Sequence, residues 1–307
     1  MRLALIAALV VVFGAAPAGS ACAQDRRRGA AQTDQTVDVS RGTRLALESL
    51  SGTVMVRAWD KDVVRVQARH STATQVSVRN VKSTLSVQTE SNRGPAGNVD
   101  YDISVPRWMP VSIEVTYDDI TVEGTESDVS AETVRGNITI KGGRGSVKAE
   151  SVEGKVIVDG AKGRLEASSV NDLIRIENTV AEISVETTNG GITLSRVQSS
   201  MVEATTVNGS IAYDGPIADE GHYSLSTHNG DILVALPERS NVTFDVRTYN
   251  GSFSSEVPVK GNGPPRRGGH ALYTLGTGSA RMDLESFGGS IKVRDVRNAA
   301  PGDGKRH

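Results

Sequence analysis

Short runs of alternating apolar and polar residues fill the chain between residues 111 and 297, and each run is interrupted by a turn sequence such as Asn-Gly. Val147 and Ala149 precede one such turn, and Val156 and Val158 follow it. Alternation with a period of two residues is typical of strands that bury one face. No stretch has the i, i+3, i+4, i+7 spacing of an amphipathic helix. The pattern therefore predicts an all-β protein.

The turns recur at a nearly constant interval. Seven steps of 18 to 21 residues and a final double step of 38 separate the turn residues Asp118, Gly136, Gly154, Asp172, Gly190, Gly209, Gly230, Gly251 and Gly289. A short strand buries too little apolar surface by itself, so repeats of this length are expected to stack in chain order with like residues above like. We predict a β-solenoid, or β-helix-like fold, of turns of about 18–21 residues.

Two polar columns accompany the turns. Core-facing hydroxyls, expected to hydrogen-bond along their column or to turn backbone, are Thr133, Ser151, Ser169, Thr187, Thr206, Thr227, Thr248 and Ser286. The asparagines beside the turns are Asn171, Asn189, Asn208, Asn229 and Asn250. We interpret the asparagines as a turn-stabilising ladder rather than a ligand groove, with the glycines supplying positive φ angles.

The N-G-[S/D/G]-I turn at this spacing resembles the bacterial adhesin-like β-strand-repeat family, whose members are domains of unknown function related to the toastrack domains. Residues 50–60 are similar to the opening repeat of that family and its W-D turn, and residues 101–106 to the entry of its solenoid. The likeness covers residues 37–297, with departures at the turn residues Asp118 and Asp172. It implies an extracytoplasmic, surface-associated protein and supplies no catalytic residues.

The first 23 residues have the form of a secretory signal peptide. An uncharged apolar run follows Arg2, and the small-residue triplet 21–23 predicts cleavage after Ala23. The run is too short to span a bilayer. The alternative is lipid attachment at Cys22, which the residue three places earlier, Gly19, disfavours because leucine is usual there. We expect an exported protein without a transmembrane segment, located in the periplasm, on the cell surface or outside the cell.

The remaining chain divides by composition into four parts. These are a disordered leader at 24–36, an N-terminal β-strand module or cap at 37–110, the β-solenoid repeat domain at 111–297 and a disordered tail at 298–307.

Composition excludes several functions. The 34 basic and 36 acidic residues of this 307-residue chain leave a net charge of −2, without the basic excess that binding to a nucleic acid requires. A single cysteine excludes a disulfide framework. We therefore expect no nucleic-acid partner and no cofactor.

Catalytic and metal-binding motifs are missing from the sequence. The histidines of the repeat region and cap, His70, His222, His228 and His270, do not form HxH or HExxH. The adjacent Asp118 and Asp119 are expected in a turn, where aspartate forms local hydrogen bonds. A catalytic groove would need converging carboxylates, but the outward glutamates form a broken row that we interpret as a solvated stripe, namely Glu132, Glu150, Glu186 and Glu285. We assign no catalytic, cofactor-binding or metal-ligating residues.

One outward column is apolar and lies two residues before the turn glycines. It comprises Val134, Val152, Val170, Val207, His228, Tyr249 and Phe287. If these side chains point outward they form a partner surface, and the alternative is that they are tucked under their own turns. We predict a non-enzymatic protein that binds an envelope or surface component, protein or glycan. An envelope-stress sensing or scaffold module is the alternative, a glycan-acting β-helix enzyme ranks third, and the solenoid edges offer a route to self-association.

Overall fold

The computed structural model describes residues 31–91, 97–261, 263 and 269–298, in which 25 strands and one short 3-10 helix, η1 (Val296–Asn298), are present. The predicted signal peptide, leader residues 24–30 and residues 299–307 lie outside the described residues. In the described ranges, no helix has the length and apolar character needed to cross a membrane.

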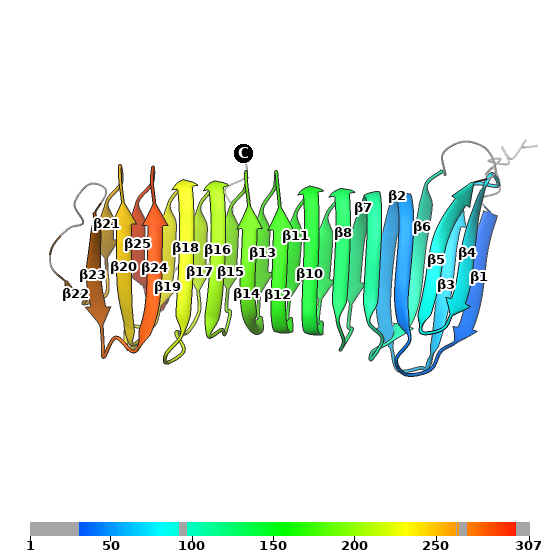
Figure 1. Ribbon diagram of the computed structural model, residues 1–307, viewed down its shortest axis with the longest axis horizontal. Coiled ribbons are helices and arrows are strands. Elements are labelled where there is room, and N and C mark those ends of the chain that lie inside the picture. The colour runs from blue at the N-terminus through cyan, green and yellow to red at the C-terminus, as the bar shows by residue number, and fades with distance from the viewer. Residues whose placement is uncertain (1–30, 92–96, 262, 264–268, 299–307) are drawn as a thin grey trace, which may run out of the picture.

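The strands stack into a long two-layered solenoid in which each turn adds one strand to each layer (Figure 1). The first layer, sheet A, runs in the order β4 (Thr74–Val81), β5 (Thr84–Ser91), β2 (Arg44–Trp59), β7 (Val111–Glu123), β8 (Val129–Arg135), β10 (Arg144–Glu153), β12 (Lys162–Ser169), β14 (Val180–Thr187), β16 (Met201–Asn208), β18 (His222–Asn229), β24 (Ala280–Ser286), β20 (Val242–Thr248), β23 (His270–Leu275) and β22 (Lys260–Gly261).

The second layer, sheet B, shares β2 and β7, whose later halves run through it. Its order is β1 (Ala31–Asp38), β3 (Val63–His70), β6 (Val99–Pro106), β2, β7, β9 (Ile138–Lys141), β11 (Val156–Asp159), β13 (Ile174–Glu177), β15 (Ile192–Ser195), β17 (Ile211–Asp214), β19 (Ile232–Leu236), β25 (Ile291–Asp295) and β21 (Phe253–Ser255). The predicted all-β solenoid is confirmed.

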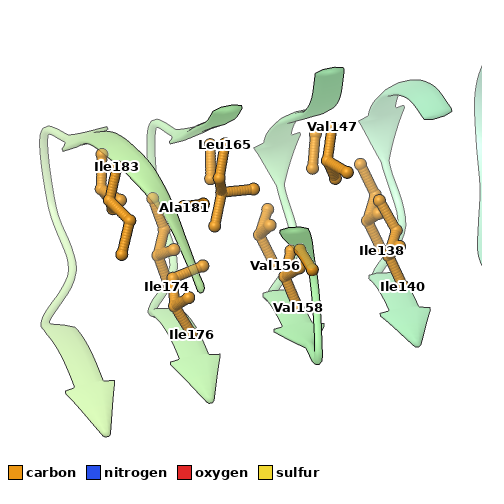
Figure 2. Packing of buried hydrophobic residues seen from close by; sticks show 14 of the residues in the cluster. Ile138, Ile140, Val147, Val156, Val158, Leu165, Ile174, Ile176, Ala181 and Ile183 are labelled. Carbon is orange, nitrogen blue, oxygen red and sulfur yellow. The ribbon is translucent and has the colours of Figure 1, made fainter. Parts of the chain in front are cut away.

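The core lies between the layers and consists of the predicted apolar columns (Figure 2). Val156 pairs in register with Ile138 on one side and Ile174 on the other, and all three side chains are fully buried. The register continues through Ile192 to Ile211. Like residues therefore stack on like residues, as the repeat requires.

The buried hydroxyl column bonds to backbone and not along itself. The Ser151 hydroxyl donates to the Gly136 carbonyl oxygen at 3.0 Å, and Thr206 donates in the same way to Gly190 at 2.9 Å. Seven of the eight hydroxyls thus donate to a carbonyl group in the turn of the adjacent repeat, and the eighth, Thr248, accepts from the Gly251 amide of its own turn. The column satisfies carbonyl groups that the tight corner turns away from both sheets.

The asparagines form the predicted ladder on the solvent side of the corner. The side-chain Nδ2 of Asn189 donates to the side-chain Oδ1 of Asn171 at 3.1 Å, and the side chains of Asn208 and Asn229 continue the series at 2.9 Å. Because each amide is both donor and acceptor, the row holds successive corners in register.

The reason for the glycine column differs from the predicted one. Among the turn glycines, only Gly136 and Gly154 have φ angles in the positive region. At Gly209 a β-carbon would lie 1.9 Å from the carbonyl oxygen of Gly190, and at Gly190 it would lie 2.1 Å from that of Asp172. At these two positions glycine is required because the neighbouring backbones approach too closely for a β-carbon.

The C-terminal repeats do not stack in chain order, which corrects the sequence-based expectation. β24 pairs with β18 on one side and with β20 on the other, so the last repeat is inserted ahead of the repeat that precedes it in sequence. β23 then pairs antiparallel with the outer side of β20. The doubled spacing before Gly289 is the length of chain needed for this return.

Two predicted boundaries also change. Residues 31–36, expected to be part of the disordered leader, form most of β1, and Asn298 belongs to η1 instead of the tail. Edge strands depend on backbone hydrogen bonds, so a polar composition did not exclude one. Within the predicted N-terminal module 37–110, β2 pairs in parallel with β7 and is itself a turn of the stack. The strands outside β2 form the cap, with β3 and β4 antiparallel to their neighbours.

Candidate functional site

The apolar column predicted at the corner points outward. Its exposed fractions range from 48% at Val134 to 37% at Tyr249, and His228 is also exposed. The strand register adds Leu50, Thr116 and Thr188 to the same line. We call this line the corner ridge; in spatial order it consists of Leu50, Thr116, Val134, Val152, Val170, Thr188, Val207, His228, Phe287 and Tyr249.

The inserted last repeat gives the ridge an aromatic end. Phe287 lies between His228 and Tyr249, with ring centroids 4.7 Å and 4.9 Å away respectively. The planes of Phe287 and His228 are nearly parallel, at 8°. The rings stack along the solenoid axis, so both faces of Phe287 are covered and its edge faces solvent.

A shallow groove of about 560 Å³ runs beside the valine end of the ridge, across the sheet A strands from β2 to β12. Val134, Val152 and Val170 line one side of it. The other side carries four carboxylates in register on successive strands, which we call the acidic row: Glu48, Glu114, Glu132 and Glu150.

The acidic row has more negative charge than its neighbours neutralise. Lys148 bridges two members, with its Nζ 2.8 Å from Glu132 and 3.1 Å from Glu150, and these carboxylates raise the pKa of Lys148. Glu48 accepts a hydrogen bond from the Gln88 amide at 3.0 Å. Like charges directly opposite on neighbouring strands repel. The groove thus combines an apolar wall with a negative one.

Sequence reasoning missed half of this row. The sequence pattern identifies Glu132 and Glu150 as outward-facing members of a row that extends to Glu285 and is first interrupted at Ser168. Glu48 and Glu114 join it because β2 and β7 enter the stack ahead of β8. The signal was the alternation of polar and apolar residues in residues 45–48 and 111–114, which places both glutamates outward.

Asp118 is not in a solvated turn as expected, but is a fully buried residue of β7. Both of its carboxylate oxygens and the nearby Ser49 hydroxyl lack a partner at hydrogen-bond geometry. Burial raises the pKa of Asp118 to about 6, with smaller contributions from the charges of Asp100 and Asp119 and an opposing one from Ser49. The adjacent Asp119 is exposed and accepts a 2.6 Å hydrogen bond from the Asn137 amide nitrogen.

The histidines are distributed along the molecule. His70 contacts Thr33 at 2.9 Å in the cap, and His270 contacts the Asp245 carboxylate at 3.2 Å near the other end. In the part of the chain that the structure describes, no group of three or more His, Cys, Asp or Glu side chains could hold a metal ion.

Comparison with solved structures finds similar chains at low identity. The chain is similar to a candidate adhesin from Parabacteroides merdae (10% identity, TM-score 0.49, covering 86% of this chain and 96% of that one). It is also similar to candidate adhesins from Parabacteroides distasonis (10%, 0.44, 87% and 98%) and Bacteroides fragilis (12%, 0.43, 86% and 97%).

A search of curated proteins gives no match. A family model described as "Toastrack DUF4097", in contrast, matches residues 43–294, from the start of β2 to within β25. The match includes every turn of the solenoid, the corner ridge and the acidic row. The chain belongs to the Toastrack DUF4097 family.

Proposed function

We propose that this is an exported, non-enzymatic, adhesin-like protein that binds a component of the cell envelope or surface through the corner ridge. The observation that carries the proposal is the exposure of an apolar side chain at seven of the ten positions of the corner ridge. Contiguous exposed apolar surface marks interaction sites in soluble proteins. With strands about 4.8 Å apart, the ten positions span roughly 43 Å.

The chemistry of the surface favours a protein partner over a glycan. Sugars pack against open aromatic faces, whereas both faces of Phe287 are covered by neighbouring rings. The acidic row beside the valines is complementary to basic side chains. A protein partner whose contact surface is extended and carries aliphatic and basic side chains along one edge therefore fits the groove.

The same features argue against an enzyme. Glycoside hydrolysis needs two carboxyl groups on opposite sides of the bond that breaks. The members of the acidic row form a single line across neighbouring strands, and Lys148 holds two of them in ion pairs. Asp118, the carboxyl group with a raised pKa, is fully buried.

Export rests on the predicted signal peptide. The mature chain should begin at Gln24 and carry no lipid, which the intact mass of the secreted product tests. A diacylglycerol on Cys22 would contradict cleavage after Ala23.

Binding to isolated cell envelopes tests the ridge. Val152→Glu combined with Val207→Glu places charge in the apolar line and should reduce retention about tenfold or more. Thr139→Glu combined with Thr193→Glu adds the same charge to the outer surface of sheet B, where both threonines are half-buried, and should change retention less than about twofold. Circular dichroism must be unchanged in both variants. Equal retention by the two variants would overturn the proposal.

A further inference from the structure

The described strands leave four free sheet edges, two at each end of the solenoid, and these differ in length. At the C-terminal end, β21 has three residues and β22 has two. At the N-terminal end, β1 and β4 have eight residues each and pair on one side only, with β3 and β5. Long edge strands expose rows of unpaired backbone donors and acceptors that template pairing with another strand.

β4 has little of the protection that edge strands usually carry. It contains no proline, glycine or lysine, and its one charged residue, Arg79, is neutralised by Glu90 at 3.0 Å. At the opposite end, Val257 and Tyr273 are buried against the last turns, which closes the core there. Among the described residues, the longer outermost strands therefore lie at the N-terminal end.

The N-terminal end is stepped. Beyond β2, sheet B continues through β6, β3 and β1, whereas sheet A continues only through β5 and β4. The overhanging β1 turns Gln35 and Val37 toward the core side, opposite the buried Val66 and Val64 of β3. Gln35 nevertheless remains exposed, because sheet A ends one strand earlier.

The core is incompletely covered at this step. Val37 of β1 and Val76 and Val78 of β4 pack against the core but stay half-buried. Apolar side chains beside unpaired backbone groups are the composition of a buried strand interface rather than a solvated end.

We propose that two copies of this chain associate end to end, with the overhanging β1 of each copy paired alongside β4 of the other. The two copies are related by a two-fold axis parallel to the strands, so sheet B of each copy meets sheet A of the other. The two junctions are therefore equivalent, and each overhanging β1 occupies the space beside β4 of the other copy. The assembly stops at two copies, because the outermost strands at the C-terminal end, β21 and β22, are only three and two residues long. The corner ridge stays accessible in this dimer. The dimer contact involves β1 and β4 and not the ridge, so it can be tested independently of the proposed binding function.

Core-facing lysines at the step test the pairing. Gln35 and Asn80 are exposed in the single chain and lie on the core side, opposite the buried Val66 and Leu85. Gln35→Lys with Asn80→Lys should leave the fold intact but bury four charges in the dimer, two at each junction. The matched control, Thr36→Lys with Gln75→Lys, adds the same charge to exposed positions on the outer sides of β1 and β4.

Sedimentation equilibrium of the purified, exported chain is the measurement. We expect a dimer at micromolar concentration, a dissociation constant raised at least 100-fold in the core-facing variant, and a change of less than about fivefold in the control. A monomeric wild type, open-ended assemblies, or equal dimerisation of the two variants would overturn the proposal. Thermal melting verifies that both variants are folded.

Discussion

Phe287 stacks on His228 with their ring centroids 4.7 Å apart, although β19 to β24 lie between them in the chain. The contact exists because β24 enters the stack between β18 and β20. The final repeat is thereby held by a ladder on each side. It cannot leave without breaking both ladders, so the C-terminal end of the solenoid is locked by its own topology.

Removing the central ring should loosen that lock. Phe287→Ala loses two aromatic contacts, each worth about 0.5–1.5 kcal/mol, and should lower the hydrogen-exchange protection of β20 and β24. Tyr117→Ala is the control, because Tyr117 is an exposed aromatic residue on β7, near the other end. Unchanged protection of β20 and β24 in Phe287→Ala would contradict the lock.

The glycine column predicts a sharp contrast between two neighbours. Gly209→Ala would place a β-carbon 1.9 Å from the Gly190 carbonyl oxygen, so the turns must separate and the free energy of unfolding should fall by about 3 kcal/mol or more. Gly191→Ala meets one oxygen, that of Ser210, at 3.3 Å and should cost about 1 kcal/mol or less. Urea titration compares the two, and similar midpoints would refute the close-approach explanation.

Strand parity in the core can be tested with two isoleucines. Ile192 is 1% exposed, so Ile192→Asp buries an unpaired charge and should prevent cooperative folding. Ile157 lies on the outer side of β11 and is half-buried, so Ile157→Asp should fold with a much smaller loss. Soluble yield and melting temperature are the readouts, and equal behaviour would contradict the assignment of faces.

Asp118 predicts an unusual dependence of stability on pH. Its pKa is about 6 in the folded chain against an ordinary value of 3.8, so the folded state favours the protonated form. Stability from this group is fully present below pH about 4 and is lost as the pH rises through about 6. At neutral pH the loss is on the order of 3 kcal/mol.

Asp118→Asn should remove that loss. The variant should match the wild type near pH 4 and be more stable at pH 7.5, as measured by urea unfolding across the range. Asp119→Asn, which changes the exposed neighbour of Asp118, should still lose stability as the pH rises from 4 to 7.5. A wild-type stability that does not fall between pH 4 and 7 would show that Asp118 does not titrate as described.

The repeated features could be predicted from the sequence because the residues that determine each of them lie within a single strand or turn. The alternation around Val147 and Val156 and the Asn171–Asn189 ladder follow from period-two spacing and a constant repeat, whereas the sequence alone leaves open the outward direction of the corner valines. The resemblance to the toastrack-related family pointed to the same fold, and the family match confirms it.

The features that were missed depend on which strands become neighbours. The insertion of β24 beside β18 arises from long-range pairing and leaves only a doubled interval in the sequence. Glu48 joins the acidic row only because β2 pairs with β7 across the intervening cap. Asp118 occupies a glycine position of the repeat, and its burial depends on the β2–β7 pairing at Gly52.

Site-specific photo-crosslinking in living cells tests the central claim most directly. A benzoylphenylalanine at Val170, on the corner ridge, should form adducts with a partner in the envelope, whereas one at Thr193, on the outer face of sheet B, should not. Adducts that are confined to Val170 and vanish with Val152→Glu and Val207→Glu are the predicted result. Adducts from Thr193 but not from Val170, or equal adducts from both, would contradict the corner ridge as the binding surface.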